Sequence, residues 1–360
     1  MKSKKTLTVI AAALFTFSVV LSGCGSKVTN NKSTSSTPST ASNSVSKKVT
    51  LTIGAYSVLQ PSIDAIIPLF QKQWEAKTGQ TVEFKESYQA SGSQATAIIQ
   101  GFEADIAPLS LEGDVQKIVD KGLITNDWKS KPHKGMITHS IAAIGVREGN
   151  PKNIKDWDDL TKSGIEVLIP NPSTSGGAKW DINAIYGAGL KISEAAGQKD
   201  PAKAKELIAK IYKNIKVLDK SGADSLTTFD KGVGDAIVTY ENELLARIQN
   251  GKKYVEVIPN FTTAIENPVA LIDKNVDKHG NRAAAEAFLD FLWSKDAQKV
   301  FADKGFRPVD DGLAKQYESR YQIPKGLFDI SYLGGWSQAN KALYDKGALW
   351  ETILTEGGTK

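Results

Sequence analysis

The spacing of apolar residues changes several times along the chain, from the two-residue period of a strand to the 3.6-residue period of a helix and back. Residues 49–54 alternate between polar and apolar side chains, which predicts an opening strand. The segment that follows places apolar side chains on one face of a helix that ends at Gly79: Ile63, Ile66, Ile67, Phe70 and Trp74. Pro68 lies inside this helical pattern, so we expect a kink or a restart there.

Strands and helices continue to alternate through the rest of the chain. Apolar runs predict further strands at 81–84, 105–107, 139–147 and 232–243, the last of them ending in polar groups. This alternation is typical of an α/β fold. The segment 49–360 is too long for a typical single hydrophobic core, which favours two lobes.

The stretch 169–180, with the sequence IPNPSTSGGAKW, predicts the start of a helix after a strand. Thr174 and Ser175 are good N-cap residues, and Gly176 and Gly177 leave the first backbone N–H groups unshielded. Such N–H groups lack partners and carry partial positive charge, so they can hold an anion. An ordinary capped turn explains this local pattern equally well. Ser91-Gly92-Ser93 repeats the pattern, and 221–223 forms a third tight polar turn.

The beginning of the chain resembles the leader of a bacterial lipoprotein. Residues 1–5 are basic, 7–21 are apolar, and Leu21-Ser22-Gly23-Cys24 resembles a lipobox. We therefore expect a signal peptide at 1–23, a lipid on Cys24, and a flexible Ser/Thr/Asn-rich tether at 24–48. The protein would then be anchored to the outer face of the cell membrane by the lipid.

Charge and motifs exclude several other functions. Removal of the signal peptide takes away Lys2, Lys4 and Lys5 and lowers the net charge from +5 to +2. A net charge this small does not indicate a nucleic-acid-binding protein. The three histidines are scattered without metal-ligand spacing, and neither a nucleophile elbow nor a P-loop is present. We predict no metal and no cofactor. Glu241 and Glu243 are interpreted as members of ion pairs, and Trp180 as core packing.

Several motifs together make the segment 49–360 resemble the bacterial sulfate-binding proteins, the solute receptors of sulfate/thiosulfate ABC importers. These motifs are SGSQAT at 91–96, EAD at 103–105, REGNP at 147–151, DWDDL at 156–160, NPSTSGGAKW at 171–180, YENE at 240–243 and GFRP at 305–308. The run from Pro172 to Trp180 is the most specific of them.

The resemblance implies a two-lobed type II periplasmic-binding fold, in which each lobe is a mixed sheet flanked by helices and the ligand lies in the cleft between them. The lobes would be 49–140 with 262–360, and 141–261. Strands near 141–146 and 260–271 would carry the chain between the lobes. The resemblance does not imply an enzyme. The protein would be a monomeric receptor that delivers its ligand to a transmembrane permease with a cytoplasmic ATPase.

The same resemblance implies a set of ligand-binding residues. Ser91 would offer its backbone N–H from the first lobe, Ser175 its hydroxyl, and Gly176, Gly177 and Ala223 their N–H groups from the second. Two positions depart from the family pattern, which has a tryptophan where Tyr240 stands and an aspartate where Ser57 stands. Tyr240 is also compatible with a core tyrosine, and Ser57 with a plain loop serine.

Three function classes remain open at this point. The first is a receptor for sulfate or thiosulfate that holds the dianion through neutral donors. The second is a receptor for another oxyanion, such as molybdate or phosphate, or for a small organic anion. The third is a hydrolase that uses Ser175 as its nucleophile, although the sequence shows no base for it.

Overall fold

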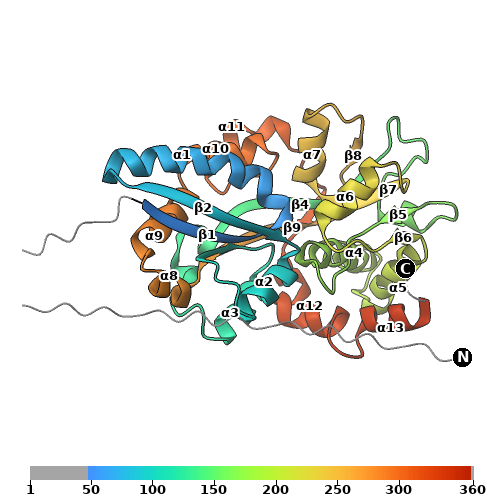
Figure 1. The fold of residues 1–360 in the computed structure, drawn as a ribbon. Helices are drawn as coiled ribbons and strands as arrows, with labels where there is room; N and C mark the ends of the chain where they lie inside the picture. Colours follow the sequence, from blue (N-terminus) through green and yellow to red (C-terminus); the bar gives the residue numbers. More distant parts are fainter. Residues whose placement is uncertain (1–47, 358–360) are drawn as a thin grey trace, which may run out of the picture. The chain divides into compact units, whose positions relative to one another are not determined.

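The computed structural model describes residues 48–357, so the predicted signal peptide, Cys24 and nearly all of the tether lie outside the described residues. The strands are β1 Lys48–Tyr56, β2 Thr81–Gln89, β3 Ile106–Pro108, β4 Met136–Val146, β5 Val167–Leu168, β6 Ile215–Val217, β7 Ala236–Tyr240, β8 Val255–Val257, β9 Phe261–Leu271 and β10 Gly326–Phe328 (Figure 1).

Helices of six to twenty residues connect these strands. They are α1 Gln60–Thr78, α2 Ser91–Ile99, α3 Glu112–Asp120, α4 Gly176–Ala195, α5 Pro201–Lys213, α6 Gly222–Asp230, α7 Glu241–Gln249, α8 Asp273–His279, α9 Arg282–Phe291, α10 Lys295–Asp303, α11 Asp311–Gln316, α12 Gly335–Leu343 and α13 Leu349–Gly357. Short 3-10 turns lie between them, of which η1 Ser57–Leu59 follows β1 directly. Within residues 48–357, no helix combines the length and the apolar run needed to cross a bilayer.

The strand order is β2-β1-β3-β9-β4-β7-β5-β6, with β10 added to β9 and β8 to β4. β1 pairs in parallel with β2 and β3, and we call these three strands the β1 set. β5 pairs in parallel with β6 and β7, which we call the β5 set. The antiparallel pair β4 and β9 joins the two sets, because β9 pairs with β3 and β4 pairs with β7. Each set therefore presents the carboxyl ends of its strands along one edge.

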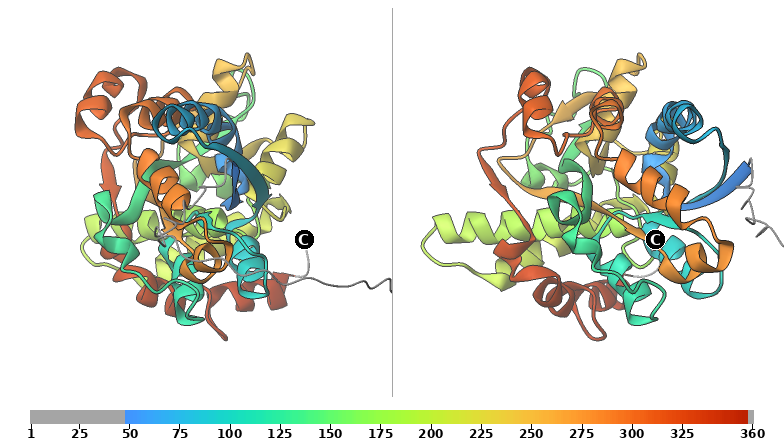
Figure 2. Two further views of the ribbon diagram at one scale, coloured as in Figure 1. Left: turned by 60° about the vertical axis from the view of Figure 1, so that its left-hand side comes forward. Right: turned by 90° about the vertical axis from the view of Figure 1, so that its left-hand side faces the viewer.

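Helices cover both faces of the β1 set. On one face, α1, β2 and α9 form an aromatic cluster with neighbouring ring centroids 4.9–6.1 Å apart: Phe70, Trp74, Phe84, Phe288 and Phe291. On the other face, α2 and α3 bury Ile98, Val115 and Ile118. Each such side chain stabilises the fold by about 1.5–3 kcal/mol when it is removed from water. Figures 1 and 2 show these helices around the strands.

The β5 set is also enclosed on both faces. Apolar side chains of α4 and α5 contribute to the main core, whereas Leu226 and Phe229 of α6 and Leu244 of α7 form a second cluster with Ile237 of β7. The C-terminal helices also pack on this side: Trp336 of α12 lies against Trp180 of α4, and Trp350 of α13 against Tyr212 of α5.

The predicted lobe boundaries stay a prediction. β4 changes partner along its length, from β9 over 136–141 to β7 over 142–146, at the place where the first lobe was expected to end. The contacts of α12 and α13 with α4 and α5 favour grouping residues 335–357 with the β5 set instead.

Three local predictions are corrected. α1 continues as one helix through Pro68, because its buried face is held by Ile66, Ile67 and Phe70 on both sides of the proline. The restart is thus excluded, and the kink that was expected as the alternative stays a prediction. Residues 221–223 are a helix start rather than a turn, since Ser221 caps α6 and Leu226 and Phe229 anchor it in the core. The strand predicted at 232–243 ends at Tyr240.

Candidate anion-binding site

A small cavity lies where the carboxyl ends of the two parallel sets meet. Its lining follows six strands: Tyr56, Ser57 and Val58 after β1, Ala90 and Ser91 after β2, Ser110 after β3, Pro170, Ser175, Gly177 and Asp181 after β5, Ser221 and Gly222 after β6, and Thr239, Tyr240 and Glu243 at the end of β7. The space open to the centre of a water molecule is about 10 Å³. As it stands, the cavity has room for about one water molecule, so a larger ligand requires its walls to move.

Ser91 occupies the first position of α2, but its side chain does not cap the helix, contrary to the sequence-based expectation. The residue before it, Ala90, stands at the N-cap without a side-chain bond. The Ser91 hydroxyl instead donates to Asp114 Oδ2 at 2.7 Å and accepts from the Ser110 backbone N–H at 3.0 Å. Because the Ser91 hydroxyl already has two partners, the backbone N–H groups in the first turn of α2 are the donors that remain to face the cavity.

Ser175 caps α4 as predicted. Its Oγ accepts from the backbone N–H of Ala178 at 3.2 Å, which leaves the hydroxyl proton available to a ligand. Gly176 and Gly177 are the first two helical residues, so their N–H groups have no partner within the helix. α4 therefore begins with a hydroxyl donor and two N–H groups at the cavity.

Gly176 also lets the two sets approach each other closely. A β-carbon at Gly176 would stand 2.4 Å from Ser110 Oγ and 2.9 Å from Asp114 Oδ2, both on the side of the β1 set. Close by, the indole Nε1 of Trp180 donates to the Ser110 carbonyl at 2.8 Å. Trp180 is thus a buried packing residue, as predicted. Its hydrogen bond to Ser110 also connects α4 to the β1 set.

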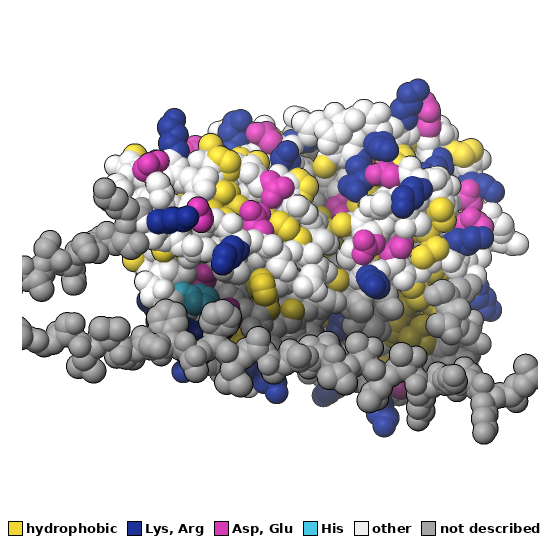
Figure 3. All heavy atoms as spheres, viewed as in Figure 1, with side chains coloured by type: hydrophobic (Ala, Val, Ile, Leu, Met, Phe, Trp, Pro, Cys, Tyr) yellow, Lys and Arg dark blue, Asp and Glu magenta, His cyan; other side chains and the backbone are white. Residues whose placement is uncertain are grey.

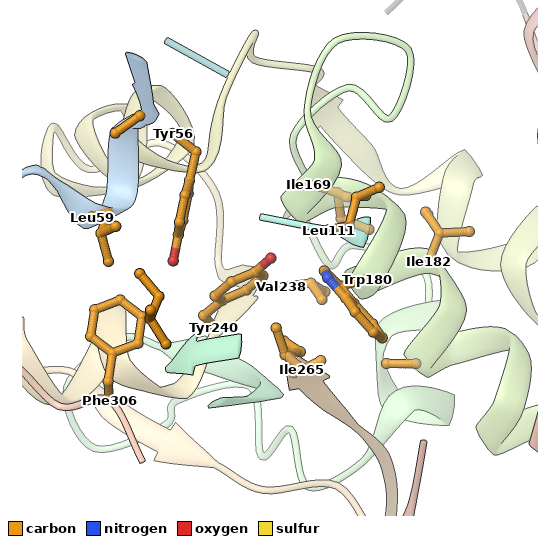
Figure 4. Close-up of a cluster of buried hydrophobic side chains, with 14 of the residues drawn as sticks. Tyr56, Leu59, Leu111, Ile169, Trp180, Ile182, Val238, Tyr240, Ile265 and Phe306 are labelled. Atoms are coloured by element: carbon orange, nitrogen blue, oxygen red, sulfur yellow. The ribbon is translucent and has the colours of Figure 1, made fainter. Parts of the chain in front are cut away.

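Two buried tyrosines supply hydroxyl groups that are not used elsewhere. Tyr56 Oη, Tyr240 Oη and Ser110 Oγ form no hydrogen bond of full geometry among the described residues. Thr138 lies close enough to Tyr56, and Ser110 to Tyr240, for a weak hydrogen bond at most. Figure 4 shows Tyr240 between Tyr56 and Trp180, with the Tyr56 hydroxyl directed toward it. Burial raises the pKa of both tyrosines well above the usual value, so both hydroxyls keep their protons. Buried polar groups in folded proteins normally have partners, so these three point to a ligand.

Two carboxyl groups, Asp181 and Glu243, also line the cavity. Burial, followed by the charge of Glu243, raises the pKa of Asp181 well above its usual range. Burial also raises the pKa of Glu243, against the lowering effects of Arg247 and of the hydrogen bond from Thr239. The ion pair predicted for Glu241 is confirmed, with Arg307 at 2.7 and 2.8 Å, but Glu243 forms none with a basic side chain among the described residues.

No lysine, arginine or histidine lines the cavity within residues 48–357. Basic groups lie in an adjoining groove of about 360 Å³, which shares Ser57, Val58 and Glu243 with the cavity. Arg247, Lys252 and Lys304 line this groove. Elsewhere on the face shown in Figure 3, basic and acidic side chains are interspersed, so that face carries no field of one sign.

The structure brings together most of the predicted site residues. Ser57, Ser91, Ser175, Gly177 and Tyr240 all line the cavity. Gly176 lies between two lining residues, and Ala223 follows the lining residue Gly222 but faces the adjoining groove. Whether each of them binds an anion stays a prediction.

Sequence reasoning did not assign six polar lining residues to the site: Tyr56, Ser110, Asp181, Ser221, Thr239 and Glu243. Asp181 carries a usable signal, because it is an acid inside the otherwise apolar stretch of α4 with no basic residue one turn away. Ser110 carries none, since it follows a three-residue strand and reaches the cavity only through the tertiary fold. Among the described residues, no group of three or more His, Cys, Asp or Glu side chains is placed to hold a metal ion.

Comparison with known proteins places the chain in a family. The family model described as "Bacterial extracellular solute-binding protein" matches residues 51–307. The chain belongs to this family. It is 38% identical over 346 residues to the sulfate-binding protein of Synechococcus elongatus, which covers 95% of each chain. It is 34% identical over 308 residues to the thiosulfate-binding protein of Pseudomonas aeruginosa, covering 84% of this chain and 91% of the relative.

A solved structure shows the same architecture. The sulfate-binding protein SubI from Mycobacterium tuberculosis superimposes with a TM-score of 0.75 at 34% identity, covering 82% of this chain and all of SubI. The α/β periplasmic-binding fold predicted from the sequence is therefore confirmed, as is the resemblance to sulfate-binding proteins. These relatives are binding proteins, and this extracellular solute-binding protein is not an enzyme.

Proposed function

We propose that this solute-binding protein captures sulfate or thiosulfate in the cavity and delivers it to an ABC permease. The observation that carries the proposal is the convergence of unused neutral donors from both parallel sets on one small cavity, without a basic side chain among the described lining residues. The names of the relatives, sulfate- and thiosulfate-binding proteins, supply the ligand class.

The donor chemistry suits a dianion. Moving a doubly charged ion out of water is costly, and each hydrogen bond to a charged group returns about 1.5–3 kcal/mol. The candidate donors are the N–H groups at the starts of α2, α4 and α6, the hydroxyl of Ser175 and the phenol of Tyr240. The three helix starts also add the partial positive charge of their aligned peptide groups.

The binding cycle that we propose uses the two sets as halves of a clamp. Ser91 belongs to the β1 set and Ser175 to the β5 set, so only the arrangement in which both sides touch completes the donor set. A bound anion would therefore favour the closed state, which the permease could recognise. The contact of Gly176 with Ser110 supports such a closed arrangement.

A receptor for another oxyanion, molybdate or phosphate, is the second candidate. The observation that favours it is Tyr240, whose hydroxyl can either donate or accept, whereas an indole N–H can only donate. A small organic anion is less well accommodated by the size of the cavity.

Isothermal titration calorimetry of the protein with sulfate, thiosulfate, molybdate and phosphate tests the proposal. We expect saturable one-site binding of sulfate or thiosulfate that is at least tenfold tighter than binding of phosphate. Tighter binding of molybdate or phosphate would favour the second candidate, and absence of binding by all four anions would contradict both.

We also propose that Cys24 carries the lipid that anchors the protein to the outer face of the cell membrane. The support is the sequence LSGC at 21–24, after a basic and an apolar segment. Metabolic labelling with a fatty acid should mark the wild type and not Cys24→Ser. Equal labelling of both would contradict this assignment.

A further inference from the structure

Asp181 is the feature that a site built only from neutral donors does not explain. Its side chain is 1% exposed and lines the cavity from the second turn of α4. Its Oδ1 has no hydrogen-bond partner within residues 48–357. An ionised carboxylate in this place would repel a bound dianion strongly, because little water remains to screen the two charges.

The neighbouring acid, Glu243, has the stabilising contacts that Asp181 lacks. Its Oε2 accepts a hydrogen bond of 2.5 Å from Thr239 Oγ1 and lies 3.3 Å from where a β-carbon on Gly222 would stand, at the start of α6. Arg247 follows one turn later in α7 and favours the charged form. When two nearby acids share a dry site, the one with more donors ionises first and the other keeps the proton. Burial raises the pKa of both acids, and Asp181, which lacks these donors, is the one that holds its proton more strongly.

We propose that Asp181 is a specificity-determining residue that donates the proton of its carboxylic acid to the bound oxyanion, so that anion binding is linked to proton uptake at any pH at which Asp181 is ionised in the free protein. The proposal rests on the function proposed above and adds a donor to it. A carboxylic acid O–H is a strong donor toward an anion, and it turns a repulsive group into an attractive one.

The groups around Asp181 agree with this protonation state. They come from several elements: Glu243 on α7, Tyr240 at the end of β7, Tyr344 after α12, and Tyr56 across the cavity on β1. Burial raises the pKa of all three tyrosines, so they stay neutral and add no negative charge to the site. Lys179, the basic neighbour on α4 itself, stacks on the Tyr344 ring at 4.8 Å instead of pairing with Asp181.

Two consequences follow for binding. If the anion requires protonated Asp181, its affinity decreases as the pH rises above the pKa of the free site, by about tenfold per pH unit for one linked proton. In addition, an acid that donates favours a fully deprotonated oxyanion such as sulfate. An ionised Asp181 would instead accept the proton of hydrogen phosphate and would favour that ion.

The test is calorimetry of the full chain with sulfate between pH 5 and 9, in two buffers of different ionisation enthalpy that contain neither sulfate nor phosphate. We expect uptake of up to one proton per anion bound and an affinity that weakens toward high pH. Asp181→Asn replaces the acid O–H by an amide N–H that needs no proton. This variant should bind sulfate within about threefold of the wild type at pH 5 and lose the pH dependence.

Glu256→Gln is the matched control. Burial, then the charge of Glu241, raises the pKa of Glu256 to about 8, but this residue lies on β8 and does not line the cavity. Its removal should leave the pH profile of sulfate affinity as it is in the wild type. The proton count is measured on the wild type alone, so the test stands even if Asp181→Asn does not fold.

The outcomes separate the two proposals. Sulfate affinity that is constant up to pH 9, with no proton exchange, overturns the link between anion binding and proton uptake and leaves the sulfate receptor intact. A pH dependence that persists unchanged in folded Asp181→Asn also overturns it, as does a wild-type preference for phosphate that Asp181→Asn reverses. Absence of sulfate binding at every pH overturns both proposals.

Discussion

The two sides of the cavity have the same architecture and different chemistry. On both sides, parallel strands end at the cavity and lead into helices. The β1 set contributes only neutral side chains to the lining, among them Tyr56, Ser57, Ser91 and Ser110. Its nearby buried acid, Asp114, accepts from the Ser91 hydroxyl, pairs with Lys117 at 2.7 Å and does not line the cavity.

The β5 set contributes the glycine-rich start of α4 and both cavity acids, Asp181 and Glu243. The side chains of the β1 set can therefore only add hydrogen bonds to the site, whereas those of the β5 set also determine its charge. Changes in the β5 set should therefore have the larger effects on anion affinity, and changes in the β1 set the smaller ones.

The largest effect is expected for Ser175→Asp. This change removes a donor from the β5 set and adds a carboxylate at a position that is 3% exposed. Sulfate affinity should fall by a factor on the order of 1,000 or more, because two like charges would share a dry cavity. Calorimetry measures the loss, and circular dichroism shows whether the fold is retained.

Ser173→Asp is the control for that change, because it adds the same charge to an exposed position of the same loop. It should bind sulfate nearly as well as the wild type. Retained binding in folded Ser175→Asp would contradict the placement of the site.

A second, smaller effect is expected for Gly176→Ala. The new methyl group would collide with Ser110 Oγ and Asp114 Oδ2, and so would hold the two sides apart. Overpacking of this kind costs about 1–3 kcal/mol, which corresponds to roughly a 5- to 150-fold loss of affinity. Gly177→Ala is the matched control, since its nearest contact would be an ordinary 3.4 Å. Equal losses in both variants would show that the close approach of the two sides is not what matters.

Removal of single hydroxyl groups should have intermediate effects. Tyr240→Phe in the β5 set and Tyr56→Phe in the β1 set each delete a buried hydroxyl without a partner among the described residues. If Tyr240 donates to the anion, its removal should weaken sulfate binding by about tenfold, from a hydrogen bond worth about 1.5 kcal/mol.

Tyr240→Trp should keep the affinity and improve discrimination against phosphate, because an indole N–H can only donate. Selectivity that is indifferent to this change would count against the assigned role of Tyr240.

The smallest effect is expected in the adjoining groove. Lys304→Glu reverses a charge that lines the groove but not the cavity. The association rate of sulfate should fall by about two- to threefold at low salt, and the difference should vanish near 1 M salt, where charges are screened within about 3 Å. Stopped-flow measurements test this, with Lys77→Glu on α1 as the control outside the groove. A loss that persists at high salt would mean that Lys304 does more than steer the anion.

Local patterns in the sequence predicted those parts of the molecule that depend on neighbouring residues. The cap at Ser175 and the helix face of α1 were readable because each depends on a few consecutive positions. The role of Ser91 was only half predicted, since its backbone is placed by the start of α2 whereas its hydroxyl is taken by Asp114, 23 residues away in the sequence.

The rest of the site could not be predicted because it is made by the tertiary fold. Ser110 meets α4 only after β3 and β5 have each found their sheet partners, and no local signal encodes that meeting. The motif at 171–180 predicted residues that line the cavity, but the acid that follows it, Asp181, became meaningful only when Glu243 was seen at the same cavity.

The central claim is that neutral donors of both sets hold a dianion without a basic side chain. The most direct test is diffraction at the selenium edge from crystals grown with selenate, a heavier analogue of sulfate. The account predicts one strong anomalous peak between the Ser91 and Ser175 backbones, with no lysine or arginine nitrogen within hydrogen-bonding distance. A peak coordinated by a basic side chain, or an empty cavity in a protein saturated with selenate, would contradict it.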